Sequence, residues 1–129
     1  MRAAGIALFG WFVPGGAYLL RGRYLPFAVF CTLVCVTFAA GIALQGAIAW
    51  PRPDDLAGLP GLDGLLLWTG AFAKLLAGAP YVLAQAAGSP VTFLAGRVHE
   101  AGTALLSIAG LFNLLALAGA FEAARPEVQ

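Results

Sequence analysis

Apolar residues follow one another along this chain in long runs rather than in short alternating stretches. The runs cover residues 5–20, 24–50, 64–85 and 101–121. The last three contain 27, 22 and 21 residues, and a helix of about 20 residues crosses a hydrocarbon core of about 30 Å. The pattern therefore predicts three transmembrane helices in these runs.

The first run is different, because it is short and contains a break. It has 16 residues and is interrupted by Pro14-Gly15-Gly16, which removes one backbone donor and adds two flexible positions. We expect a short or broken membrane helix, which either crosses the bilayer or forms a re-entrant hairpin. No run alternates as transmembrane β-strands of about 10 residues do, so the predicted fold class is all-α, a polytopic helical bundle.

The composition agrees with a membrane protein. The chain of 129 residues is 61% hydrophobic and only 10% charged, with a formal net charge of +1, whereas soluble domains carry about 25% charged residues. We expect residues 1–129 to form a single integral-membrane domain. A charge balance so close to zero gives no basic surface for nucleic acid, and no internal repeat is evident.

The charged residues mark the ends of the predicted membrane segments. All but Lys74 lie outside the four runs: Arg2, Arg21, Arg23, Arg52, Asp54, Asp55, Asp63, Arg97, Glu100, Glu122, Arg125 and Glu127. If the first run crosses the membrane, the arginines divide three to three, so the positive-inside rule gives no orientation. If it is re-entrant, they divide four to two, with Arg21 and Arg23 on the cytoplasmic side.

Small and polar residues mark the packing faces of the third and fourth runs. In the fourth, one arc contains His99, Gly102, Thr103, Leu106, Ser107, Gly110, Asn113 and Leu117. In the third, Gly70, Lys74 and Gly78 follow at i+4 spacing. Membrane helices pack through such faces, because lipid supplies no hydrophobic drive for their association. We expect these residues to mediate helix packing or partner docking.

Lys74 lies near the middle of the third run, where an uncompensated lysine costs at least about 2.5 kcal/mol. Four interpretations are open: a polar clasp within the bundle, docking to an acidic residue of another subunit, an ion or proton path, and snorkelling. Asn113 is the expected neutral partner, and Glu100 is the nearest acidic candidate along the chain.

Two prolines predict further breaks. Pro80 is expected to kink or end the third helix near Gly78, leaving a short segment over residues 81–85. Ser89-Pro90 is typical of a helix start, so residues 90–98 are a candidate interfacial helix, with an ordinary loop as the alternative. Residues 51–63 are expected to form an acidic surface loop.

Candidate chemistry is sparse. Cys31 and Cys35 share a helix face, but no His or further Cys accompanies them in the sequence, so we interpret them as apolar fillers rather than a metal or redox pair. His99 and Glu100 are adjacent and point in different directions on a helix, and Glu100 suits the first turn of a helix. We predict no catalytic residue, metal site or cofactor.

The turn after the first run resembles the P-G-x-G-H-x-x-x-G-R turn of small bacterial membrane proteins related to the two-transmembrane hairpin domain. The matching residues are Pro14, Gly15, Gly16, Gly22 and Arg23. Ala17 replaces the second glycine of the motif and Tyr18 replaces its histidine, so no role of that histidine carries over. Independently of the resemblance, we expect an interfacial turn or a lipid-headgroup site formed by Pro14, Gly15, Gly16, Tyr18, Arg21, Gly22 and Arg23.

A second part of the chain carries a related resemblance. It is similar to the C-terminal span of an uncharacterised bacterial family that begins with the same hairpin, through His99-Glu100-x-Gly102-Thr103 and Gly110-Leu111-x-Asn113-Leu114-Leu115. The resemblance implies a membrane module of unknown activity, and it supplies no cofactor or catalytic residue.

The expected function follows from the missing chemistry. The leading hypothesis is a non-enzymatic structural or accessory subunit of a membrane complex or homo-oligomer, whose partners are the lipid bilayer and other subunits or itself. The alternative is a small transport or channel module with a polar path around Lys74 and Asn113. The expected location is the bacterial inner membrane, with several passes.

Overall fold

The computed structural model describes residues 3–51, 54, 57–58, 61–88 and 97–123. Its helices are α1 (Ala3–Phe12), α2 (Gly16–Leu19), α3 (Tyr24–Ala43), α5 (Gly61–Leu75), α6 (Ala79–Ala86) and α7 (Arg97–Glu122). The described residues contain helices, turns and extended segments but no β-strand. This confirms the all-α prediction.

Two helices, α3 and α7, are long and apolar enough to cross a membrane. The pair α5 and α6 passes the same test together, but it is bent by 102° at its break. The described residues therefore contain two candidate spans, or three if the bent pair counts as one. These helices indicate a membrane protein.

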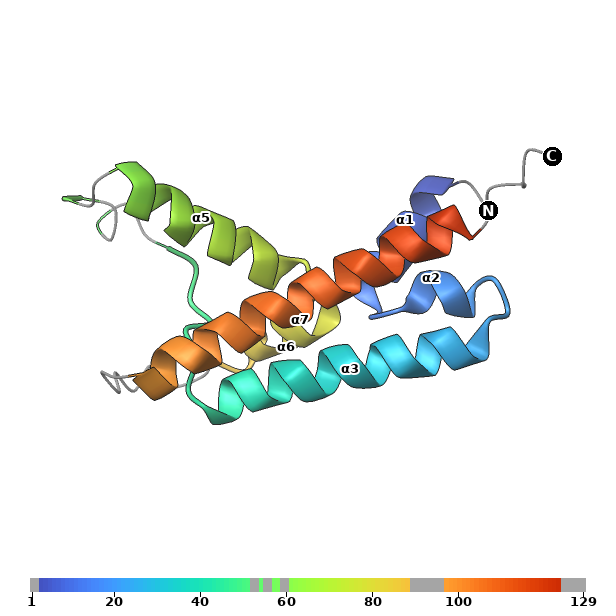
Figure 1. Cartoon of the computed structure of the whole chain (residues 1–129), viewed down its shortest axis with the longest axis horizontal. Helices are drawn as coiled ribbons and strands as arrows, with labels where there is room; N and C mark the ends of the chain where they lie inside the picture. The colour runs from blue at the N-terminus through green and yellow to red at the C-terminus, as the bar shows by residue number, and fades with distance from the viewer. Residues whose placement is uncertain (1–2, 52–53, 55–56, 59–60, 89–96, 124–129) are drawn as a thin grey trace.

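The two long helices pack against each other in antiparallel orientation along the length of the molecule (Figure 1). Gly102 of α7 lies so close to α3 that a Cβ atom there would be 2.8 Å from the carbonyl oxygen of Gly41. Beside this contact, Val34 and Phe38 of α3 and Leu106 of α7 are buried in the larger core cluster. Close backbone approach thus takes the place of bulky packing, as is usual between membrane helices.

The first run is a broken helix that turns back on itself. Ile6 of α1 packs beside Ala116 and Ala120 of α7, the chain reverses at Gly15, whose φ is 73°, and α2 returns along α7. The start of α1 and the turn after α2 therefore lie at the same end of the molecule (Figure 1). The structure therefore folds this run back on itself within the molecule.

The third run is also broken. The helix α5 ends at Leu75, Gly78 adopts a φ of 72°, and α6 begins with Pro80 in its first turn. The expected break near Gly78 is therefore present. However, Gly78 does not continue the α5 stripe of Gly70 and Lys74, because its backbone belongs to the break and not to a helix.

The second run ends its helix earlier than the hydropathy suggests. The helix α3 stops at Ala43, and residues 44–50 form an unwound segment without helix. Gln45 has a φ of 56°, and the N–H of Gly46 bonds back to the carbonyl of Gly41 at 2.9 Å. Side chains from distant helices stabilise this segment. The hydropathy of the run therefore does not show where the helix ends.

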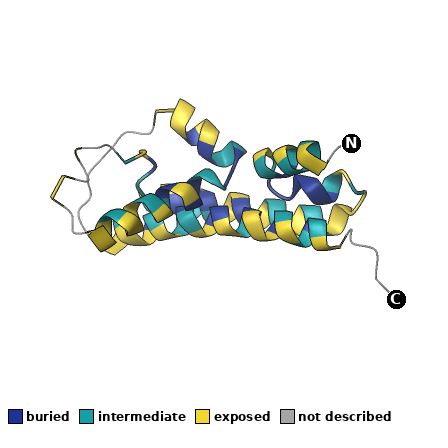
Figure 2. Cartoon of the chain, turned by 90° about the horizontal axis from the view of Figure 1, so that it is seen from above, coloured by how far each residue is buried: buried dark blue, intermediate teal, exposed yellow. Residues whose placement is uncertain are grey.

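Buried residues gather along α7 and at the helix breaks, whereas the outer faces of α3, α5 and α7 are exposed (Figure 2). Leu25 and Val29 of α3 and Leu111 and Leu115 of α7 are among the exposed apolar side chains. The candidate interfacial helix over residues 90–98 lies mostly outside the described residues, and its last positions, Arg97 and Val98, are the first residues of α7.

Candidate functional site

The polar side chain deepest in the structure is Asn113, which is 1% exposed. Its amide Nδ2 donates to the carbonyl oxygens of Trp11 and Leu76, both at 2.9 Å. Its Oδ1 accepts from the backbone N–H of Gly15 at 3.2 Å. One side chain therefore binds the end of α1, the turn after it and the end of α5.

The two helix breaks also touch each other directly at this point. The indole Nε1 of Trp11 donates to the carbonyl oxygen of Leu75 at 3.1 Å. A Cβ atom on Gly78 would collide with the carbonyl oxygen of Trp11 and would lie 2.9 Å from that of Phe12. We call this cluster of Trp11, Gly15, Gly78 and Asn113, with the carbonyls they contact, the central joint.

A second polar cluster surrounds the unwound segment 44–50. The Nζ of Lys74 donates to the carbonyl oxygen of Ala47 at 2.9 Å. The backbone N–H of Ala47 donates in turn to Oγ1 of Thr103 at 2.9 Å. Both main-chain groups of Ala47 are thus satisfied by side chains, one from α5 and one from α7.

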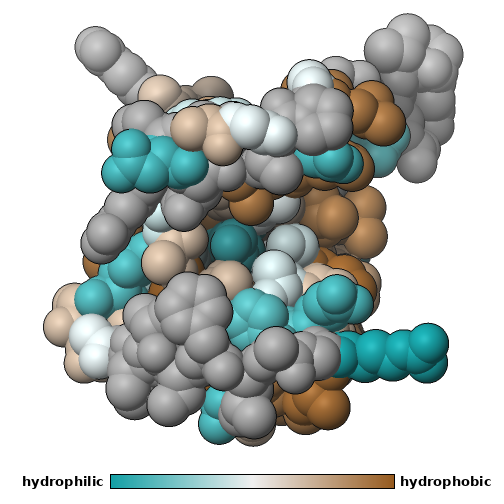
Figure 3. Space-filling view, turned by 90° about the vertical axis from the view of Figure 1, so that its left-hand side faces the viewer, coloured by the Kyte–Doolittle hydropathy of each residue, from teal (hydrophilic) through white to brown (hydrophobic). Residues whose placement is uncertain are grey.

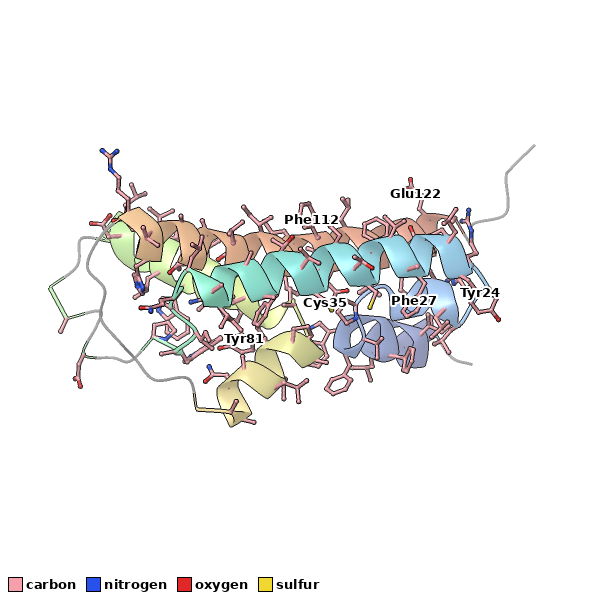
Figure 4. The ribbon with its side chains drawn as sticks, turned by 90° about the horizontal axis from the view of Figure 1, so that it is seen from below. Tyr24, Phe27, Cys35, Tyr81, Phe112 and Glu122 are labelled. Atoms are coloured by element: carbon pink, nitrogen blue, oxygen red, sulfur yellow. The ribbon has the colours of Figure 1, made fainter. Side chains whose placement is uncertain are left out.

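The neighbouring carbonyls of the segment are bound in the same way. The Nε2 of Gln85 donates to the carbonyl oxygen of Ile48 at 3.0 Å, and the hydroxyl of Tyr81 donates to the same oxygen at 3.4 Å. Nδ1 of His99 lies 2.6 Å from the carbonyl oxygen of Gln45. Tyr81 is labelled in Figure 4, between α6 and α3. We call the side chains of Lys74, Tyr81, Gln85, His99 and Thr103 the polar clasp.

The chemistry of the polar clasp explains its residue types. A backbone segment outside a helix exposes N–H and C=O groups that lipid cannot satisfy, so such a segment is tolerated at membrane depth only where protein groups bind it. Lys74 is 6% exposed and supplies a donor from an otherwise apolar helix. This geometry supports the clasp interpretation of Lys74 over docking, snorkelling or a conduction path.

The expected pairing of Lys74 with Asn113 differs from the observed bonds. Lys74 donates to Ala47, whereas Asn113 donates to Trp11 and Leu76. Glu100 is exposed at the start of α7. Sequence spacing put Lys74 and Asn113 on facing helices. In the structure, each of them donates to main-chain carbonyls at a helix break or at the unwound segment.

The predicted small-residue face of α7 lies against α5. Ser107 Oγ donates to the carbonyl oxygen of Gly70 at 3.4 Å and to that of Thr103 at 3.2 Å. A Cβ atom on Gly110 would overlap the carbonyl oxygen of Ala73. Gly102, Gly110 and Asn113 are buried. Because Gly102 and Gly110 have no side chain, the end of α3 and α5 can approach α7 closely at these two positions.

The residues predicted as an interfacial turn separate into two groups. Pro14, Gly15, Gly16 and Tyr18 are buried, because the break lies inside the molecule, and the Tyr18 ring stacks on Phe30 at 5.7 Å. This corrects their assignment to an interfacial turn. Only Arg21, Gly22 and Arg23 form the turn itself.

The two arginines of this turn contact aromatic rings. The Arg21 guanidinium donates to the carbonyl oxygen of Ala120 and lies 5.2 Å from the centre of the Phe121 ring. Arg23 lies 6.0 Å from the centre of the Tyr18 ring. Arg21 therefore caps the last turn of α7, a position where a cation is favourable.

The remaining candidates include Cys31 and Cys35, which are free cysteines on α3, half-buried and exposed respectively. Within the described part of the chain, no group of three or more His, Cys, Asp and Glu side chains is placed to hold a metal ion. Every buried side-chain nitrogen or oxygen atom among these residues has a hydrogen-bond partner.

Three members of the two clusters were not predicted from the sequence, namely Trp11, Tyr81 and Gln85. Gln85 is an uncharged polar residue at the end of an apolar run, and this is a usable signal. Nothing in the sequence distinguishes Trp11 from an ordinary membrane aromatic residue, because its partner is 64 positions away.

Comparison with known proteins gives a family but no activity. Residues 5–128 match the model of a family of unknown function, DUF6677. No curated protein and no solved structure matches the chain. Because the family model covers nearly every residue described above, including both clusters, this chain belongs to the DUF6677 family of unknown function.

Proposed function

We propose that the protein is a non-enzymatic integral membrane protein that serves as a structural or accessory subunit of a membrane complex or homo-oligomer. The observation that carries this proposal is the use of its polar side chains. Lys74, Asn113 and Thr103 all bind main-chain groups of the same chain. Groups used in this way stabilise the fold and are not arranged as an acid, base and nucleophile.

The surface supports the same function. Large apolar side chains are exposed along both long helices, among them Leu25, Val29, Leu33 and Val36 on α3 and Ile108, Leu111, Leu114 and Leu115 on α7. In a bilayer such faces contact lipid or the helices of another subunit. We place the docking surface of the subunit here, and not at Lys74.

Native mass spectrometry of the protein, extracted gently from its own membranes, tests this function. We expect a stable assembly with other chains or with further copies of itself. Lys74→Met should leave the composition of that assembly unchanged while lowering its melting temperature, because Lys74 serves the fold. A protein that is recovered only as a monomer, at every detergent concentration tried, would contradict the subunit function.

One observation favours transport as a second candidate. Two broken helices meet at the central joint, and discontinuous helices of this kind build the substrate sites of many transporters. In this function the path would pass Asn113, with Lys74, Thr103 and Ser107 beside it. Proteoliposomes that show no ion or solute flux in any oligomeric state would exclude it.

We further propose the bacterial inner membrane as the location, on the strength of the arginine-rich turn and its resemblance to the two-transmembrane hairpin motif. Arg21 and Arg23 lie at the end of the molecule where α7 also ends. Fractionation of the source cells tests the location directly. Recovery of the protein in another membrane or in the soluble fraction would contradict it.

A further inference from the structure

The two halves of the chain have the same order of elements. In the first half, α1 is followed by a break at residues 13–15, the short helix α2 and the long helix α3. In the second, α5 is followed by a break at residues 76–78, the short helix α6 and the long helix α7. Each half is therefore a helix, a break, a shorter helix and a long helix.

The two breaks share a glycine with a positive φ, although their backbone geometry differs. Gly15 has φ 73° and ψ 3°, and Gly78 has φ 72° and ψ −127°, both conformations that favour glycine. Three positions after each glycine comes a buried tyrosine, Tyr18 at 7% exposed and Tyr81 at 5%. The glycines and the tyrosines are thus both 63 positions apart.

The contacts with α7 give the direction of the second half. Gly70 lies beside Ser107, Ala73 beside Gly110 and Leu76 beside Asn113. The last part of α5 therefore follows the chain direction of α7, although the two helices cross at an angle (Figure 1). After the break, Gln85 of α6 reaches Ile48 in the unwound segment. That segment also contacts Thr103 near the start of α7. The second half therefore enters from the end where α7 begins and returns to it.

The first half runs in the opposite sense. A Cβ atom on Gly10 would lie 2.8 Å from Leu117, and the next residue, Trp11, accepts a hydrogen bond from Asn113. The chain direction of α1 is therefore opposite to that of α7. After the break, the Tyr18 hydroxyl lies beside Gly119 of α7, 2.6 Å from the position that a Cβ atom on this glycine would take. Arg21 then caps α7 at Ala120. This half enters from the end where α7 finishes, and Figure 4 shows Tyr24 and Glu122 at that same end.

We infer that the chain crosses the bilayer only twice, with α3 and α7. The hairpins α1–α2 and α5–α6 enter from opposite faces and meet at the central joint. Asn113 lies two residues from the centre of the 101–121 run, about 3 Å along the helix axis. The 10 residues of α1 span about 15 Å, half of a core of about 30 Å.

The charges give this two-span topology an orientation. Residues 20–23 mark one face, the turn face, and the first residues of α5 and α7 mark the other, the loop face. In the sequence, Arg2, Arg21, Arg23 and Arg125 flank segments that end at the turn face, whereas Arg52 and Arg97 flank segments that end at the loop face. The positive-inside rule then puts the turn face in the cytoplasm by four to two.

The carboxylates reinforce this difference between the faces. Asp54, Asp63 and Glu100 belong to the loop face, where the space-filling view of that end of the molecule shows hydrophilic groups spread across it (Figure 3). Glu122 belongs to the turn face. The inference concerns topology alone, so it holds whether the subunit or the transport function is correct.

The test is single-cysteine labelling in membrane vesicles of known orientation. In a background with Cys31→Ser and Cys35→Ser, one cysteine is introduced at Ala4, Leu20, Ala57, Ala87 or Ala123, all of which are exposed and lie outside the glycine positions. A membrane-impermeant maleimide is applied to inside-out and right-side-out vesicles. Labelling after detergent treatment is the control for reactivity.

We expect Ala4, Leu20 and Ala123 to react together, from the cytoplasmic side, and Ala57 and Ala87 to react from the other side. A four-span chain would instead group Ala57 with Ala4 and Ala123. A three-span chain with only the first hairpin re-entrant would group Ala87 with Ala4 and Leu20. Either grouping, or a position that reacts from neither side, would overturn the inference, and none depends on whether a partner subunit is present.

Discussion

At the scale of single residues, the polar side chains within the apolar runs serve the backbone of this protein. A helix break at membrane depth leaves main-chain donors and acceptors without partners, and each such group costs several kcal/mol in hydrocarbon. Asn113 satisfies three of these groups at once. Lys74 satisfies a fourth, at the unwound segment. Their removal therefore tests the fold and not a reaction.

Replacing Asn113 by Leu should be the most destabilising single change in α7. It removes both donors and the acceptor of the central joint while keeping a side chain of similar size, and each orphaned buried group costs about 1–3 kcal/mol. We expect a lower melting temperature in detergent, followed by tryptophan fluorescence. Leu111→Val, which keeps an apolar side chain on the exposed face of α7, is the control. Equal melting temperatures for wild type and Asn113→Leu would contradict the role of the joint.

Lys74→Met tests the polar clasp. The variant keeps the length of the side chain but loses the donor to Ala47, so we expect the unwound segment 44–50 to loosen. Hydrogen exchange in lipid nanodiscs should then increase at residues 44–50 and stay unchanged in α2. Thr69→Val is the control, because its hydroxyl bonds only within its own helix, to Leu65. Unchanged exchange at the segment would show that Lys74 does not hold it.

At the scale of elements, close backbone contact sets how α3 and α5 lie on α7. Gly41 and Gly102 join the two long helices, and Gly110 faces Ala73 of α5. The hydrophobic run that contains α3 is 27 residues long, yet the helix has only 20. Its remaining residues are held by polar groups from α5, α6 and α7, so the length of this helix is decided by its neighbours.

Gly110→Ala tests the contact between α5 and α7. The added methyl group would meet the main chain of Ala73, which cannot move aside as a flexible side chain can. We expect α5 to shift away from α7 and the free energy of unfolding to fall by about 1–3 kcal/mol, which is typical of overpacking. A lower melting temperature would report this loss. In Gly5→Ala, by contrast, the new Cβ meets nothing within 4 Å, and this variant should be neutral or slightly stabilising.

At the scale of the whole molecule, the central joint couples two hairpins that are otherwise separate. Trp11 binds Leu75 across the joint, and Asn113 binds Trp11 and Leu76. Three helices thus share one small set of hydrogen bonds. The stability of each hairpin should therefore depend on the presence of the other.

A double-mutant cycle measures this coupling. Trp11→Phe removes only the indole donor, and Asn113→Ala removes the amide. Because both hold the same joint, we expect their effects on the free energy of unfolding to be non-additive by about 0.5–3 kcal/mol. Arg21→Gln, which alters the cap of α7 at Ala120, should combine additively with Trp11→Phe. Additive effects in both cycles would show that the hairpins are independent.

The sequence by itself determined the class of this protein. Long apolar runs with charges at their ends specify helices in a membrane, because lipid tolerates neither exposed charge nor unpaired backbone. The same logic identified the breaks at Pro14-Gly15-Gly16 and near Gly78, where glycine and proline interrupt a helix. Glycine, serine and asparagine in one arc of the last run indicated its packing face, and the structure turns much of that arc towards α1, α3 and α5.

Only the tertiary structure decided what the breaks and polar residues do. Gly15 and Gly78 are 63 positions apart, and sequence spacing does not reveal that their segments enter from opposite ends and meet. The partners of Asn113 and Lys74 are main-chain groups, which every residue has, so side-chain types could not single them out. The end of α3 at Ala43 likewise depends on donors and acceptors from α5, α6 and α7, because an unwound backbone is stable in lipid only where distant side chains bind it.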